Sequence, residues 1–121
     1  MKKTIVIAED EKPIAEAQKL ILGKEYAIHL AHDGETALQL IQRVRPDIVV
    51  LDLMLPKMSG IDICRQIRAS QELRHTKVVM VTAKNMRQDE LRGMDVGADD
   101  YIMKPFEPLE LLHVVHQVAN R

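Results

Sequence analysis

Short apolar runs rich in β-branched residues recur along the chain. They occupy residues 4–8, 48–51 and 77–82, and each ends at or just before a polar residue. Unbroken runs of this kind are typical of strands covered on both faces, as in a parallel sheet. Pro46 and Pro56 bracket the second run, and proline cannot donate to a strand ladder. The pattern therefore predicts three buried strands, the second with firm limits.

Between these runs, apolar residues recur at the three- and four-residue spacing of helices. Pro13 and Pro108 suit the first turn of a helix, because proline lacks the N–H group that this turn leaves unpaired. Ser59, with Asp62 three residues later, resembles a helix cap. Helices are predicted to begin near Pro13, after the Asp33-Gly34 turn, after Ser59, near Arg87 and at Pro108.

The predicted fourth helix, residues 87–96, differs from the others in its few apolar anchors. They are Leu91, Met94 and Val96, and the segment also contains Gly93. Glycine lowers helix stability, and few anchors leave little surface to bury. We expect this helix to be the most weakly held element.

Residues 26–31 and 100–104 fit two further strands, which gives five strands alternating with five helices. This alternation predicts an α/β fold with right-handed crossovers and a parallel sheet covered on both faces. A chain of 121 residues is long enough to bury one core, so we expect residues 1–121 to form one domain.

Polar groups fall at the carboxyl ends of four predicted strands. They are Glu9 with Asp10, then Asp52, Thr82 and Lys104. In open parallel sheets these strand ends face the crevice in which ligands bind. The candidate chemistry is therefore expected at one edge of the sheet.

This set of groups favours phosphoryl transfer. Converging carboxylates stay ionised only beside a cation, and all-oxygen ligands suit Mg²⁺ better than zinc. A carboxylate such as Asp52 can attack phosphorus and form an aspartyl phosphate. The hydroxyl of Thr82 and the ammonium of Lys104 can hold the oxygens of a tetrahedral anion. The sequence predicts that Asp52 accepts a phosphoryl group.

Charge and cysteine content narrow the partners and the compartment. Seventeen Lys and Arg residues nearly balance eighteen Asp and Glu residues, for a formal charge of -1. Without a basic field, direct binding to nucleic acid is not expected. The single cysteine, Cys64, and the lack of a signal peptide or a membrane-length apolar run favour a reducing cytoplasm and no membrane contact.

Over essentially its whole length, the chain resembles the receiver domains of two-component response regulators. The matching segments are Glu9-Asp10, Asp52 in VVLDLMLPKMSG, Thr82-Ala83 in VVMVTAK, and Lys104-Pro105-Phe106 in GADDYIMKPF. The resemblance implies a flavodoxin-like (βα)5 doubly wound sheet with strand order 2-1-3-4-5. It also implies that a phosphohistidine on a histidine kinase or phosphotransfer protein donates to Asp52.

The resemblance further implies a role for each matching residue. Asp10, Asp52 and the Met54 carbonyl would bind Mg²⁺, with Glu9 reaching the metal through water, although aspartate is commoner at position 9 in the family. Thr82, the Ala83 amide and Lys104 would hold the phosphoryl oxygens. A cis bond before Pro105 would aim the Lys104 side chain, and Tyr101 matches the aromatic switch position.

In this interpretation the domain catalyses its own phosphorylation and dephosphorylation but is not a turnover enzyme. Thr82 is drawn toward the phosphate, Tyr101 turns inward, and the fourth helix shifts. The change of conformation then controls an output domain or a downstream protein. The alternative is a degenerate receiver that acts only as a protein-interaction module.

Other families and sites fit the residues less well. A haloacid dehalogenase needs a second acid two residues after the nucleophile, where this chain has Met54. A flavodoxin needs a phosphate-cradling loop after the first strand, and DEKPIAE lacks the glycines and hydroxyls for one. His113 and His116 share a helical face, but we expect solvated histidines there rather than metal ligands. Asp99 and Asp100 are expected to form a solvated turn.

Overall fold

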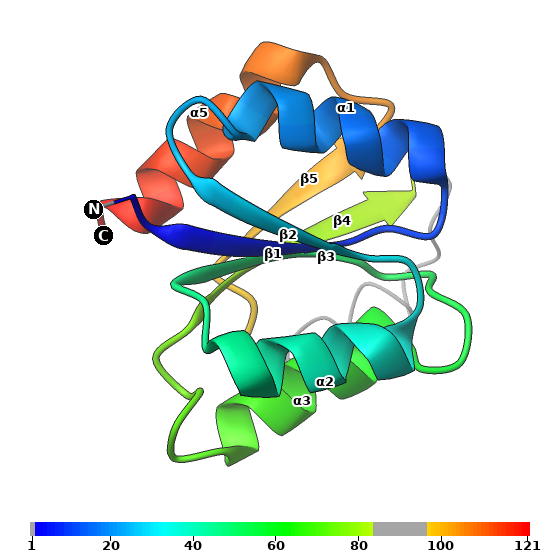
Figure 1. The fold of residues 1–121 in the computed structure, drawn as a ribbon, viewed down its shortest axis with the longest axis vertical. Coiled ribbons are helices and arrows are strands. Elements are labelled where there is room, and N and C mark those ends of the chain that lie inside the picture. Colours follow the sequence, from blue (N-terminus) through cyan, green and yellow to red (C-terminus); the bar gives the residue numbers. More distant parts are fainter. Residues whose placement is uncertain (1, 84–96) are drawn as a thin grey trace.

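A parallel sheet is the middle layer of the fold in the computed structural model, which describes residues 2–83 and 97–121 (Figure 1). Its strands are β1 (Thr4–Ala8), β2 (Ala27–Ala31), β3 (Ile48–Asp52), β4 (Lys77–Ala83) and β5 (Asp100–Lys104). All neighbouring pairs are parallel, and the order across the sheet is β2-β1-β3-β4-β5. The predicted flavodoxin-like order 2-1-3-4-5 is therefore confirmed.

Helices cover both faces of the sheet. Figure 1 shows α1 (Lys12–Leu22) and α5 (Pro108–Ala119) on one face, with α2 (Gly34–Val44) and α3 (Gly60–Ala69) on the other. The predicted fourth helix, residues 87–96, lies outside the described residues, as does the expectation that it is weakly held. Among the described residues, no helix is long and apolar enough to cross a membrane.

Two cores flank β3, all five residues of which are buried. Val49 and Leu51 pack on one side of the sheet, in a cluster that includes Ile63 of α3. Ile48 and Val50 pack on the other side, in a cluster that includes Leu111 of α5. Successive strand residues point to opposite faces, so a strand covered on both faces is apolar on both, as in the run from Ile48 to Leu51 that precedes Asp52. This explains why the β3 sequence is an unbroken run.

Side-chain caps fix the starts of two helices at the carboxyl edge of the sheet. The Asp33 carboxylate accepts a hydrogen bond from the Thr36 N–H at 2.7 Å, and α2 starts at the next residue, Gly34. The Ser59 hydroxyl accepts from the Asp62 N–H at 3.2 Å and starts α3, as the sequence predicted. Each cap satisfies one N–H that the first helical turn leaves without a partner.

The strand predicted at residues 26–31 begins one residue later, at Ala27. The Tyr26 N–H donates to the Leu22 carbonyl at 3.0 Å, so this residue closes the end of α1 instead of joining the strand ladder. The Tyr26 side chain is buried in the core, where it packs beside the ring of His116. The pattern of apolar residues identified a core position here, but it placed the start of the strand one residue too early.

Asp99 is not part of a solvated turn, so that prediction was wrong. One of its carboxylate oxygens accepts from the Val78 N–H at 2.7 Å and from an Arg68 guanidinium nitrogen at 2.8 Å. Arg68 also donates to the main-chain carbonyls of Thr76 and Gly97. These bonds join α3 to the starts of β4 and β5. They support the register in which Lys104, at the far end of β5, pairs with Ala83.

Gly34 lies where α2 meets the loop after β3, and we predict that it cannot be replaced without loss of stability. A Cβ atom there would lie 2.0 Å from the Met58 carbonyl oxygen, a backbone atom. The Gly34→Ala variant should lower the free energy of unfolding by about 1–3 kcal/mol, because the loop must move to admit the methyl group. Urea unfolding measures this change. The control, Gln39→Ala at an exposed position of the same helix, should stay close to the parent, and an unchanged urea midpoint for Gly34→Ala would contradict the prediction.

Candidate functional site

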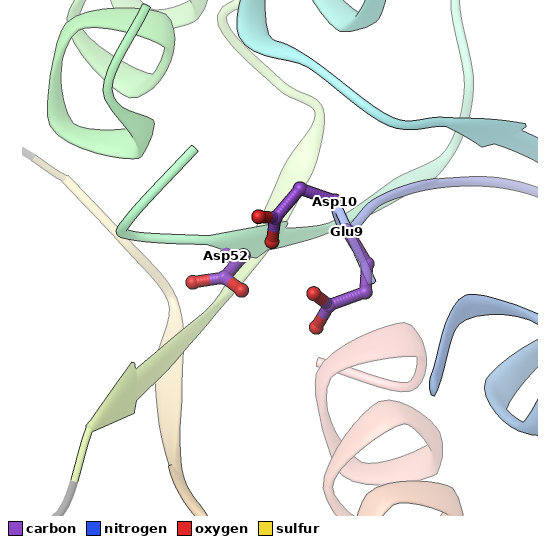
Figure 2. A group of neighbouring side chains, drawn as sticks. All are labelled: Glu9, Asp10 and Asp52. Carbon is purple, nitrogen blue, oxygen red and sulfur yellow. The ribbon is translucent and has the colours of Figure 1, made fainter. Parts of the chain in front are cut away.

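Three acidic side chains meet at the carboxyl ends of β1 and β3. These strands are neighbours, with Ala8 opposite Leu51, so Glu9 and Asp52 emerge side by side. Oxygens of Glu9, Asp10 and Asp52 all lie within 4.8 Å of one another, and Figure 2 shows the three side chains gathered around a common space. Glu9 is 1% exposed and Asp52 is 6% exposed, whereas Asp10 is exposed.

Lys104 supplies a cation to this cluster from the end of β5. Its Nζ lies 2.8 Å from Asp52 Oδ2 and 2.7 Å from Glu9 Oε1. The contact with Asp52 is a hydrogen bond, whereas the contact with Glu9 is an ion pair without the alignment of a regular hydrogen bond. The peptide bond between Lys104 and Pro105 is cis, which confirms that prediction.

Burial raises the pKa of the Glu9 carboxyl from 4.5 to about 7. The contact with Lys104 and a hydrogen bond from the Glu11 N–H lower this pKa, but not enough to offset burial, and the Asp52 carboxylate raises it further. Burial alone would lower the pKa of Lys104, but the adjacent Asp52 and Glu9 outweigh it and leave this pKa above its ordinary value. The Lys104 side chain therefore stays protonated at neutral pH, whereas the Glu9 carboxyl gains and loses its proton near neutral pH.

The end of β4 places Thr82 and Ala83 next to this cluster. Asp52 pairs with Val81 across the ladder, so Thr82 lies one residue further along the neighbouring strand. Thr82 is buried, and its hydroxyl donates a long hydrogen bond of 3.5 Å to the Ile102 carbonyl. Ala83 pairs with Lys104. Both residues therefore lie beside the strand that carries Lys104, although their roles toward a phosphoryl group stay predictions.

Met54 lies at the rim of the site. Its N–H donates to Asp52 Oδ1 at 3.0 Å, and its side chain is largely exposed. Since Lys104 contacts the other oxygen, both oxygens of Asp52 are held in the structure. The predicted use of the Met54 carbonyl as a metal ligand stays a prediction.

Tyr101, the predicted switch residue, lies on β5 three residues before Lys104. It is 40% exposed and pairs with Met80 of β4. Its rotation toward Thr82 stays a prediction, and the segment 84–96 expected to shift with it lies outside the described residues.

His32 belongs to the surroundings of the site, and the sequence analysis missed it. Its Nδ1 lies 3.0 Å from the main-chain oxygen of Glu9. Because a carbonyl oxygen only accepts hydrogen bonds, Nδ1 must carry the hydrogen and donate. The sequence feature that could have identified His32 is its position directly after the predicted strand 26–31, at the same edge of the sheet as Glu9 and Asp52. The expectation that His113 and His116 are solvated, and not metal ligands, stays a prediction. His116 contacts the Glu25 carboxylate, and neither is in the one potential metal cluster found among residues 2–83 and 97–121.

The cluster of Glu9, Asp10 and Asp52 has the character of a site for a hard divalent cation. It offers only oxygen atoms, and two of its three carboxylates are buried. Glu9 Oε1 has no regular hydrogen bond within the described protein, which leaves it able to accept one from a metal-bound water. Oxygen ligands with room for retained waters are what Mg²⁺ prefers. The residues present therefore fit this ion.

Comparison with known proteins identifies the family. A model of the response regulator receiver domain matches residues 5–116. The chain belongs to this family. The matched residues include all the strand ends that carry the candidate site.

Solved receiver domains share the fold over the whole chain. A protein described as a response regulator, from Chloroflexus aurantiacus, is 34% identical over 100% of both chains, with a TM-score of 0.91. The BeF3-activated DrrB receiver domain is 33% identical, also over 100% of both chains, with a TM-score of 0.87. The chemotaxis response regulator CheY4 of Vibrio cholerae is 26% identical, with a TM-score of 0.90, over 98% of this chain and 99% of that one.

Proposed function

We propose that this receiver domain is a phosphoacceptor and that Asp52 is the residue modified. A carboxylate oxygen of Asp52 attacks the phosphorus of a phosphohistidine on a histidine kinase or phosphotransfer protein. The new P–O bond forms as the P–N bond breaks, and the imidazole nitrogen of the donor keeps the electron pair. The observation that carries the proposal is the position of Asp52, at a strand end among two acids and a lysine that contacts it at 2.8 Å.

Lys104 is proposed to neutralise charge on the phosphoryl oxygens. Its ammonium already lies against Asp52, so it needs little movement to contact a group bound to that side chain. Preorganised charges of this kind lower the barrier without reorganisation at the moment of reaction. The Thr82 hydroxyl and the Ala83 N–H are proposed to donate to the remaining oxygens.

Mg²⁺ is proposed as the required cofactor. Glu9, Asp10 and Asp52 would hold it, together with the Met54 carbonyl, and Glu9 would act through water. The bound ion would supply positive charge next to the oxygens being transferred. In the structure, Lys104 contacts both Glu9 and Asp52 and balances part of their negative charge.

The acyl phosphate is proposed to act as a signal. The product stays attached to the chain, so the domain is a stoichiometric acceptor that assists its own modification and not a turnover enzyme. Phosphorylation adds up to about two negative charges and strong acceptor oxygens at Asp52. The Thr82 hydroxyl and then Tyr101 are proposed to respond, and the altered surface to control an output domain or a downstream protein in the cytoplasm.

The proposal predicts that the chain takes up one phosphoryl group from acetyl phosphate in the presence of Mg²⁺. Intact-mass measurement should show one added phosphoryl group on the parent and none on Asp52→Asn, because the amide of asparagine lacks the negatively charged oxygen that acts as the nucleophile. Asp62→Asn, at an exposed position of α3, is the matched control and should be modified like the parent.

The same measurement separates the phosphoacceptor from the degenerate alternative. A parent chain that remains unmodified, under conditions that label a known receiver domain, would contradict the proposal. That result would favour a receiver that acts only by binding other proteins. Modification of Asp52→Asn to the same extent as the parent would place the phosphate on another residue.

A further inference from the structure

A mainly apolar groove lies between α1 and the segment that leads from β5 into α5. It encloses about 620 Å³, and its walls include Ile14, Ile21, Phe106 and Pro108. Figure 1 shows α1 and α5 on the same face of the sheet, with this segment beside them. Sites for small molecules are commonly clefts of this size, with apolar walls and a few polar groups. The size and lining of the groove therefore match that class of site.

Gln18 gives the groove an unusual polar feature. This residue of α1 lines the groove and is only 2% exposed. Both its Oε1 and its Nε2 are buried, and neither has a hydrogen-bond partner in the part of the chain that the structure describes. Buried polar side chains nearly always have partners, so an amide with neither its donor nor its acceptor satisfied needs an explanation.

We propose that the groove binds a neutral, largely apolar small molecule that carries an amide group. An amide of the ligand offers one acceptor and one donor side by side, and Gln18 offers the complementary pair. Two parallel hydrogen bonds would then satisfy both buried atoms. Both amide atoms are buried in the structure, so the proposed pairing requires Gln18 to turn its amide toward the groove by rotation about its side-chain bonds.

The surrounding charges favour a neutral ligand. The charged residue among those that line the groove is Lys104, whose Nζ is already engaged by Asp52 and Glu9. An ionised ligand would therefore enter an apolar space without a counterion, at a large desolvation penalty. The groove adjoins the acidic cluster, because Lys104 and Ala83 line it, but the ligand contacts proposed here do not involve Asp52 and do not depend on its phosphorylation.

Benzamide is the probe, because it combines an apolar ring with a primary amide. The ¹⁵N-labelled full chain is titrated and followed by two-dimensional NMR. Saturable shifts are expected at the Gln18 side-chain NH₂ and at the main-chain amides of Ala17, Ile21 and Phe106. The amide of Ile63, beneath the opposite face of the sheet, should not move. An absence of saturable shifts in the groove would overturn the proposal.

Two comparisons test the role of the amide pair. N,N-dimethylbenzamide keeps the ring and the carbonyl but has no N–H, so its affinity should be about tenfold lower for the loss of one hydrogen bond. Gln18→Met keeps an unbranched side chain of similar size and should weaken benzamide binding by about tenfold or more. Gln66→Met, at an exposed position of α3, is the matched control and should bind as the parent does.

Three results would contradict the pairing. Equal affinities for the two probes would show that the N–H group contributes nothing, and this comparison needs no variant to fold. Unchanged benzamide affinity in a folded Gln18→Met chain would show that Gln18 is not a partner. Cross-relaxation between the Gln18 NH₂ and a water, persisting at saturating benzamide, would show that a buried water alone satisfies the amide.

Discussion

Replacing Lys104 with methionine should slow phosphoryl uptake from acetyl phosphate by about 10²- to 10³-fold, the effect of removing one preorganised charge from a transition state. Methionine retains most of the length of the side chain but lacks the ammonium group that lies 2.8 Å from Asp52 Oδ2. The rate of mass increase, at saturating Mg²⁺, measures the effect. The reduction should appear as a slower reaction and not as a different site of modification.

The matched control for this variant is Lys19→Met, at an exposed position of α1, which should react at the parent rate. Circular dichroism establishes that both variants are folded. A folded Lys104→Met chain that reacts within about threefold of the parent would contradict the role of Lys104, because such a difference is far below the loss of one stabilising charge.

The second large effect concerns the buried acid Glu9. The pKa of Glu9 is about 7 in the folded chain, whereas the ordinary value, which applies to the unfolded chain, is 4.5. Between pH 4.5 and pH 7, the folded state therefore keeps a proton that the unfolded state has released. Stability must therefore fall as pH rises through this range. Without Mg²⁺, the free energy of unfolding should fall by roughly 2–3 kcal/mol between pH 4.5 and 8 on account of Glu9.

Glu9→Gln isolates this contribution, because glutamine has the same shape and does not titrate. Urea unfolding at several pH values, with a chelator present, should show that the parent loses stability relative to the variant as the pH rises. Lys104 does not interfere, since its raised pKa changes stability only above about pH 10.5. Glu16→Gln, at an exposed position, should follow the parent, and a constant difference between parent and Glu9→Gln across the range would contradict the raised pKa.

The sequence predicted the layers of the fold because local patterns determine them. The run at residues 48–51 has no polar position, and a strand of this kind is stable only between two covering layers. The alternation of strands and helices then implies a parallel sheet. The order of the strands could not be predicted in this way, because hydrophobic periodicity does not say which strands are neighbours. That order came from the resemblance to receiver domains.

The convergence of Glu9, Asp52 and Lys104 was also predictable, because the carboxyl ends of parallel strands share one edge of the sheet. The sequence did not predict that Lys104 contacts both Glu9 and Asp52. That contact depends on the register of β5 relative to β3, with β4 between them, and on the reach of the lysine side chain. Neither quantity can be obtained from local sequence.

Asp99 and Gln18 show where sequence patterns are insufficient. Asp99 resembles a turn residue, but its partner Arg68 is 31 residues away, and only the folded chain brings the two together. Gln18 occupies a core-facing position of α1 that the apolar spacing of the helix did not mark. Both are polar residues whose environment is set by tertiary contacts, and periodicity detects apolar residues only.

Chemical identification of the phosphorylated residue tests the central claim most directly. Borohydride reduces an acyl phosphate of aspartate to homoserine, which peptide mass spectrometry can locate. After treatment with acetyl phosphate and Mg²⁺, the account predicts homoserine at position 52 and at no other aspartate. Homoserine at Asp10 or elsewhere, or phosphate retained on a residue that borohydride does not reduce, would contradict the assignment of Asp52 as the phosphoacceptor.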